Sequence, residues 1–123
     1  MTLLNLITLI KRHFPDATDR DICHYTNELE SRLSDEIFSP AGMDCRVKPL
    51  DVTKDTDTPL LLDNEYLSLY INYIFAIISM QNSDFETSNI HSELFNQKFS
   101  ELAVQIRRTH KPIKNTPITG GDF

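Results

Sequence analysis

The stretch Asp63–Met80, DNEYLSLYINYIFAIISM, decides the fold. Twelve of the fifteen residues from Tyr66 to Met80 are apolar. A helix that is apolar on every side is either buried or spans a membrane. A membrane span needs about 18 to 20 apolar residues, and carboxylates flank this shorter run. The stretch therefore predicts a central helix that starts at an Asp63 N-cap and that other helices or neighbouring subunits cover.

A second long helix is expected directly after this one. The polar residues 82–84 predict a turn, and residues 84–110 follow a helical pattern. Its apolar residues recur at heptad-like spacing: Leu94, Phe95, Phe99, Leu102, Ala103 and Ile106. Two helices joined by a short turn form an antiparallel hairpin, which we expect to be the longest unit of the fold.

Two more helices are expected before the central one. Apolar residues recur at helical spacing over residues 2–13, where Thr2 is a suitable N-cap and Phe14-Pro15 ends the helix. Thr18 can cap a further helix over about residues 19–37, and the acidic residues in its first turn favour the positive end of the helix dipole.

The segment 43–62 between these pairs reads differently. Its alternating Asp and Thr residues compete for backbone hydrogen bonds and disfavour a helix. We expect an extended connection, with residues 45–47 and 50–52 as short strand pieces. A structureless loop of about 20 residues is uncommon in a compact domain and often belongs to a binding segment.

The sequence thus predicts an all-α fold, a small bundle of about four helices. Residues 1–110 form a single helical domain, with the connection 43–62 extended. Two prolines and two glycines in residues 111–123 exclude a helix there, so this segment is expected to be a flexible C-terminal tail.

Charge restricts the possible functions. The chain has 123 residues and a formal net charge of −6, which argues against a protein that mainly grips nucleic acid phosphates. Residues 15–65 carry a balance of −8, whereas residues 107–123 carry +3. An acidic body with a basic end suits contacts between copies or with an acidic partner, although a solvated acidic face with an incidental tail explains it equally well.

No pattern of residues predicts catalysis, a metal or a cofactor. The four histidines form no ligand pair, and Asp55 and Asp57 lack the glycine and glutamate of a calcium loop. Cys23 and Cys45 are far apart and are expected to be reduced thiols. Three carboxylates, Glu28, Glu30 and Glu101, fall on polar helix faces, where we expect them to be solvated.

Protein interfaces are the better expectation for the remaining side chains. Tyr66, Tyr70 and Tyr73 recur at helical spacing, and tyrosine combines a large apolar body with a polar tip, which suits half-buried contacts. The full set of interface candidates is Tyr66, Tyr70, Tyr73, Arg107, Arg108, Lys111, Lys114, Ile118 and Phe123.

The stretch Thr58–Tyr73 resembles a pattern in small helical proteins of tailed bacteriophages and prophages. A proline and leucines precede an acidic residue and a tyrosine, and a Leu-Tyr pair and a further tyrosine follow. The likeness continues through Ser88-Asn89, Leu94-Phe95-Asn96, Phe99, Ala103, Arg108 and His110-Lys111-Pro112. It covers roughly residues 58–112. It departs at residues 104–106, where relatives tend to carry aromatic residues and this chain has Val-Gln-Ile.

These relatives look like head–tail connector, or adaptor, proteins. The resemblance implies a virion protein that is made in the host cytoplasm and assembles with itself as a ring. Its partners would be the portal protein and a tail or stopper protein, with genomic DNA only passing through. It implies no enzyme activity, no cofactor and no membrane. The alternatives are a tail-completion or baseplate-associated component, or a small helical regulator that binds protein or DNA through Arg107, Arg108 and the tail.

Overall fold

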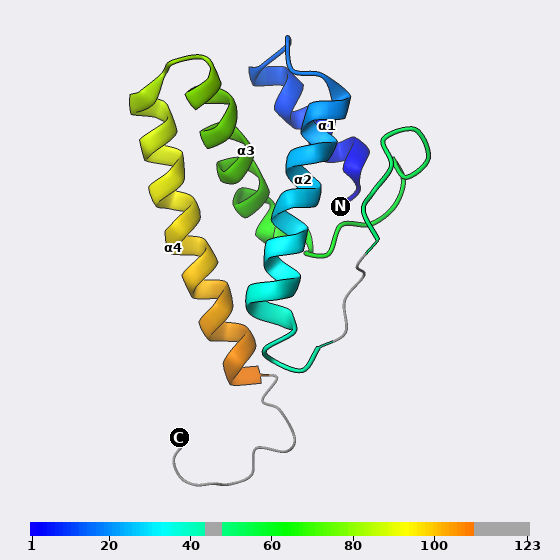
Figure 1. Cartoon of the computed structure of the whole chain (residues 1–123), viewed down its shortest axis with the longest axis vertical. Coiled ribbons are helices and arrows are strands. Elements are labelled where there is room, and N and C mark those ends of the chain that lie inside the picture. The colour runs from blue at the N-terminus through cyan, green and yellow to red at the C-terminus, as the bar shows by residue number, and fades with distance from the viewer. Residues whose placement is uncertain (44–47, 110–123) are drawn as a thin grey trace, which may run out of the picture.

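The computed structural model of the chain describes residues 1–43 and 48–109 and has an all-α fold. The elements are α1 (Leu3–His13), α2 (Asp19–Leu33), a π-helical turn η1 (Ser34–Phe38), a 3₁₀ turn η2 (Asn64–Tyr66), α3 (Leu67–Gln81) and α4 (Phe85–Thr109). In Figure 1, α3 lies between the α1–α2 pair and α4, which forms the opposite edge of the bundle. The predicted bundle with a long antiparallel hairpin is confirmed.

The first two helices begin at the predicted caps. Thr2 and Asn5 form a reciprocal capping box, in which the Asn5 backbone N–H donates to the Thr2 hydroxyl at 3.3 Å. Thr18 accepts from the backbone N–H of Asp21 at 3.1 Å. These bonds satisfy N–H groups that have no partner inside the helix.

The second helix ends in a wider turn. After Leu33 the backbone continues as η1, where the Ser39 N–H donates to the Ser34 carbonyl at 2.8 Å, five residues back. Gly42 then adopts a φ of +79°, a conformation that glycine accepts without a Cβ penalty. Helical structure thus covers residues 19–38, close to the predicted 19–37.

Burial of α3 is achieved mainly within one copy of the chain. α1, α2 and α4 all contact it, and Leu69, Tyr70 and Ile74 have almost no exposed surface. Within α3, only the last two residues, Met80 and Gln81, are exposed. The described helices therefore do most of the covering, and neighbouring subunits are not needed for it. Asp63 precedes η2 rather than α3 and makes no side-chain cap hydrogen bond.

Small and polar residues bring α3 and α4 together. The Ser88 hydroxyl of α4 donates to the Ala76 carbonyl of α3 at 2.8 Å and is buried. Nearby, His91 Nδ1 lies 2.8 Å from the Asn72 Oδ1. Between the helices, the chain reverses at Ser83, whose φ is +63°. These contacts fix the register of the hairpin.

Aromatic rings join the hairpin to the first two helices. The Phe75 ring of α3 lies 4.9 Å from the Phe14 ring and 5.1 Å from the His91 ring, between centroids. The Arg32 guanidinium of α2 lies over the Phe99 ring of α4 at 4.9 Å from its centroid. Such aromatic and cation–π contacts add specific geometry to apolar burial.

The described part of the connection, residues 48–62, is a series of turns rather than strands. Asp51 accepts bonds from the Thr53 backbone N–H and hydroxyl, at 2.8 and 2.7 Å, and these bonds lower the pKa of the Asp51 carboxyl. The short strand expected at residues 50–52 is wrong, because Asp51 and Thr53 satisfy the backbone locally. The one β-bridge within the described residues joins Thr2 to Pro59. The strand piece expected at residues 45–47 lies outside the described residues, as does the tail at 111–123.

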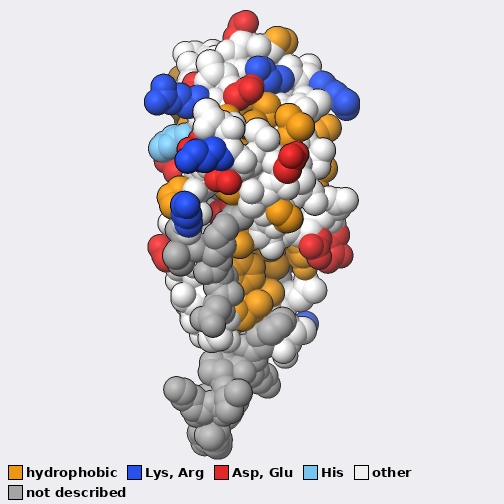
Figure 2. Space-filling view, turned by 90° about the vertical axis from the view of Figure 1, so that its right-hand side faces the viewer, with side chains coloured by type: hydrophobic (Ala, Val, Ile, Leu, Met, Phe, Trp, Pro, Cys, Tyr) orange, Lys and Arg blue, Asp and Glu red, His pale blue; other side chains and the backbone are white. Residues whose placement is uncertain are grey.

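No helix in the described ranges is long and apolar enough to cross a bilayer. The apolar character of α3 is accounted for by the packing of the bundle. Lys, Arg, Asp and Glu side chains are mixed over the upper half of the face in Figure 2, and hydrophobic side chains gather lower down.

Truncation of the core of α3 should show how much stability this packing supplies. We expect Ile74→Ala to lower the free energy of unfolding by about 2–5 kcal/mol, because it leaves a cavity at a site with no exposed surface. Met80→Ala on the same helix removes an exposed side chain and should change it by about 0.5 kcal/mol or less. Urea unfolding followed by circular dichroism measures both, and equal losses would contradict this account of α3.

Candidate functional site

One face of α2 carries polar side chains that bind the backbone of the connection. Cys23, Asn27 and Glu30 are four and three residues apart, so they lie on one side of the helix. All three face the segment 48–62 and make hydrogen bonds with it. We call these three residues the α2 polar row.

Asn27 holds the first part of the connection. Its Oδ1 accepts from the Leu50 N–H at 2.8 Å, and its Nδ2 donates to the Leu50 carbonyl at 3.0 Å. The Cys23 thiol donates to the same carbonyl at 3.4 Å. The side-chain amide thus satisfies both backbone groups of a buried residue, as a neighbouring strand would. This explains why a segment without regular structure packs tightly here.

Glu30 holds the second part and is itself buried, with 5% of its surface exposed. Its Oε2 accepts from the Leu61 N–H at 2.7 Å and from the Tyr70 hydroxyl at 2.8 Å. The Tyr70 oxygen in turn accepts from the Leu62 N–H at 3.2 Å. A buried carboxylate is costly unless hydrogen bonds replace its water, and charge-assisted bonds of this kind are among the stronger ones.

Three consecutive backbone amides therefore bind three different parts of the bundle. The Leu60 N–H donates to the Met1 carbonyl at 2.9 Å, beside the start of α1. The Leu61 N–H donates to Glu30 of α2, and the Leu62 N–H to Tyr70 of α3. We call this arrangement the amide clamp. It joins all the helices before α4.

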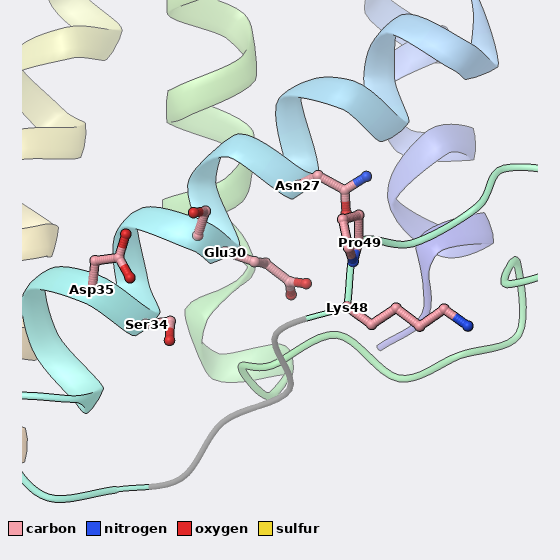
Figure 3. A pocket seen from close by; sticks show the side chains of 7 residues that line it. Asn27, Glu30, Ser34, Asp35, Lys48 and Pro49 are labelled. Carbon is pink, nitrogen blue, oxygen red and sulfur yellow. The ribbon is translucent and has the colours of Figure 1, made fainter.

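A small pocket lies beside the clamp. Its volume is about 170 Å³, and its lining residues are Asn27, Glu30, Ser31, Ser34, Asp35, Lys48 and Pro49. Figure 3 shows the Glu30 side chain extending from α2 toward the Lys48–Pro49 segment. Typical small-molecule sites measure about 300–1,000 Å³, and the Glu30 carboxylate already binds protein donors. The arrangement is suited to holding the chain together rather than to acting on a ligand.

The expectation that Glu30 is solvated was wrong, and so was the expectation that Tyr70 forms an interface. Tyr70 has no exposed surface, so a docking partner cannot reach it. Helical periodicity places Glu30 on a polar face, but it does not show that the connection covers that face. A signal was nonetheless present, because Glu30 follows Thr26 by one turn and both share the side of α2 that leads to Leu33.

The other two tyrosines are half-buried and bind side chains of this chain. The Tyr66 hydroxyl donates to the Gln105 Oε1 of α4 at 3.0 Å. The Tyr73 hydroxyl donates to the Glu28 carboxylate of α2 at 3.3 Å. Burial, followed by the nearby Glu28 charge, raises the pKa of Tyr73. Their predicted role in contacts between proteins stays a prediction.

Arg107 and Arg108 lie exposed in the last turn of α4. This position is favourable for cations, because the helix dipole is negative there. The four remaining interface candidates, Lys111, Lys114, Ile118 and Phe123, lie outside the described residues. The structure therefore does not bring the basic end together as a site.

Sequence reasoning missed a second feature, a line of exposed apolar side chains on α4. Ile90, Leu94 and Val104 are 52%, 40% and 38% exposed; we call them the outer row. The heptad-like pattern included Leu94 among the core positions. The observed core face of α4 uses Ser88, Phe95 and Leu102, so Leu94 lies on the opposite side.

No cluster of three or more His, Cys, Asp or Glu side chains is placed to hold a metal within residues 1–43 and 48–109. Comparison with protein-family models, curated proteins and solved structures found no match for this chain. Inference about function therefore rests on the residues themselves and on the resemblance described above.

Removal of the Glu30 carboxylate should destabilise the clamp. We expect Glu30→Ala to lower the free energy of unfolding by about 2–4 kcal/mol, because two buried donors lose their acceptor. The Leu61 amide should also exchange its hydrogen faster with solvent. Glu28→Ala, an exposed neighbour on the same helix, should cost under about 1 kcal/mol. Urea unfolding and hydrogen exchange by NMR measure these effects, and equal losses for both variants would contradict the clamp.

Alkaline pH should weaken the fold partly through Cys23. Burial, and then the Asp51 charge, raises the pKa of this thiol from an ordinary value of 9.0. The unfolded chain then loses the thiol proton at lower pH than the folded chain, so stability falls as pH rises above about 9. We expect Cys23→Ala to reduce the slope of unfolding free energy between pH 8 and 10.5, with the rest coming from groups such as Tyr73. An unchanged slope would contradict this assignment.

Proposed function

We propose that this protein is a structural subunit of a tailed-phage or prophage virion. Its role would be that of a head–tail connector, which assembles as a ring between portal and tail and lets DNA pass. The proposal rests on the resemblance over residues 58–112 and on one structural observation. The outer row of α4 exposes three large apolar side chains although the core is complete without them.

The residues behind the resemblance have a consistent structural role. Leu60, Leu61 and Leu62 supply the three amides of the clamp, and Tyr70 completes it. A pattern that specifies a clamp between helices is what proteins of one fold would share. This supports a common scaffold, and the assembly role follows from the family resemblance.

Opposite edges of the bundle carry exposed apolar residues. A ring needs two different surfaces on each subunit, which meet head to tail. Leu4 of α1 is 47% exposed at one edge, and the outer row of α4 lies at the other. Apolar side chains gathered in a row are typical of surfaces that contact another protein.

The charge of the chain also suits a subunit around DNA. A net charge of −6 disfavours adhesion to phosphates, so DNA would slide rather than bind. The basic end, Arg107 and Arg108 with Lys111 and Lys114, would contact the portal or a neighbouring copy, and Ile118 and Phe123 would anchor it. The role needs no catalysis and no cofactor.

A tail-completion or baseplate-associated component would use the same features, and its partner protein would differ. A DNA-binding regulator would need a basic recognition helix. The described helices offer only Arg107 and Arg108 at the end of α4, and the acidic body opposes DNA binding.

Mixing the purified protein with the portal protein encoded beside it should give ring-shaped complexes. We expect Leu94→Asp to reduce complex formation at least about tenfold, because it places a charge in an apolar contact. Asn96→Asp adds the same charge at an exposed site off the outer row and should have little effect. Native mass spectrometry and electron microscopy measure the complexes. Failure of the unmodified protein to form any ring or portal complex would contradict the proposal.

A further inference from the structure

Helix α4 has one side without a neighbour in the bundle. Among the described elements it contacts only α3 and η1. Its buried residues, Ser88, Phe95 and Leu102, recur every seven residues on the inner side. The outer row lies on the opposite side of the helix.

The outer row belongs to a longer straight line. At 100° per residue, Ile90 and Val104 lie within about 40° of one direction around the helix, and so do Glu86, Gln97 and Arg108. From Glu86 to Arg108 this line is about 33 Å long at 1.5 Å per residue. A partner helix could therefore contact it over nearly its whole length.

The line is symmetric about its middle. Gln97 is seven residues from both Ile90 and Val104, and eleven residues from both Glu86 and Arg108. The charges at its ends are opposite, since Glu86 is in the first turn and Arg108 in the last. If a second copy of α4 is laid against it in the opposite direction, each acidic end meets a basic end.

We propose that the outer row of α4 pairs with the outer row of a second copy of this chain. The two helices run antiparallel about a two-fold axis beside Gln97. Ile90 then lies against Val104 of the second copy, and Glu86 against Arg108 of the second copy. Because the contact is two-fold, each pairing occurs twice.

The surface around Val104 has a matching shape. A shallow hollow there is lined by Ser100, Glu101, Val104, Gln105, Arg108 and Thr109. In the antiparallel register, Ile90 of the second copy lies over this hollow, and Leu94 of the second copy lies opposite the small Ser100. The pairing therefore places large side chains against small ones, as helix packing requires.

The same register brings Glu93 opposite Glu101, which weakens the pair. With few large apolar side chains on each copy, the contact falls in the class of small interfaces. We expect a dimer whose population depends on protein concentration in the micromolar range.

This inference goes beyond the proposed connector role. A two-fold contact closes at two copies and cannot continue around a ring. The pair is therefore the form of the free protein, and it must separate before α4 takes part in any lateral contact. Dimerisation of the free chain and ring formation with the portal are separate measurements, so either proposal can fail alone.

A charge swap tests the register. In sedimentation equilibrium of the full chain, Glu86→Arg and Arg108→Glu should each weaken dimerisation about tenfold, because each variant places like charges together at both ends. The double variant restores opposite charges, so its dissociation constant should return to within about threefold of the original. Circular dichroism checks that the variants fold. A monomer at every concentration tested, or a double variant no tighter than either single one, would overturn the proposal.

Cross-linking tests the axis without changing charge. Gln97→Cys places two thiols beside the two-fold axis, so a short bismaleimide should link the copies rapidly. Asn96→Cys is the matched control, because Asn96 is exposed on the next position, away from the line. We expect at least tenfold faster cross-linking at position 97, and equal rates at both positions would overturn the assigned axis.

Discussion

The fold depends on one buried carboxylate. Glu30 lies in the middle of α2, yet it binds the connection through Leu61 and α3 through Tyr70. Without it, the Leu61 N–H and the Tyr70 hydroxyl would each lose an acceptor inside the protein. The bonds to either side, Leu60 to Met1 and Leu62 to Tyr70, hold only if the connection stays in place. A single acidic side chain therefore orients the first three helices relative to one another.

Local features of the chain were predictable, and features that depend on distant segments were not. Thr2 and Thr18 cap helices through bonds to residues three positions away, so sequence reveals them. The α3–α4 hairpin follows from a short turn and a long apolar stretch. The burial of Glu30 depends on residues about thirty and forty positions further along the chain, and no helical period reports such a contact. The connection was recognised as irregular, but its tight packing came from the α2 polar row, which pattern analysis treats as solvated.

The two long helices of the hairpin have different relations to solvent. α3 is apolar nearly all round and is covered by the other helices, so its composition serves the core. α4 has a modest core face and an exposed apolar row opposite it. Surface that contacts other molecules is thus concentrated on the helix that contributes least to holding the other helices together. Changes on the outer row can alter association while leaving the fold intact.

The π-helical turn at the end of α2 has a consequence for how the chain tolerates insertions and deletions. Such a turn holds one residue more than an α-helical turn of the same rise. Deleting one residue within Ser34–Phe38 would restore a regular helix, but it would rotate all that follows by about 100°. Ile37 and Phe38, both buried, would leave the core, and the connection would start from a different side of the bundle. The length of this segment is therefore constrained even though no single residue in it touches the clamp.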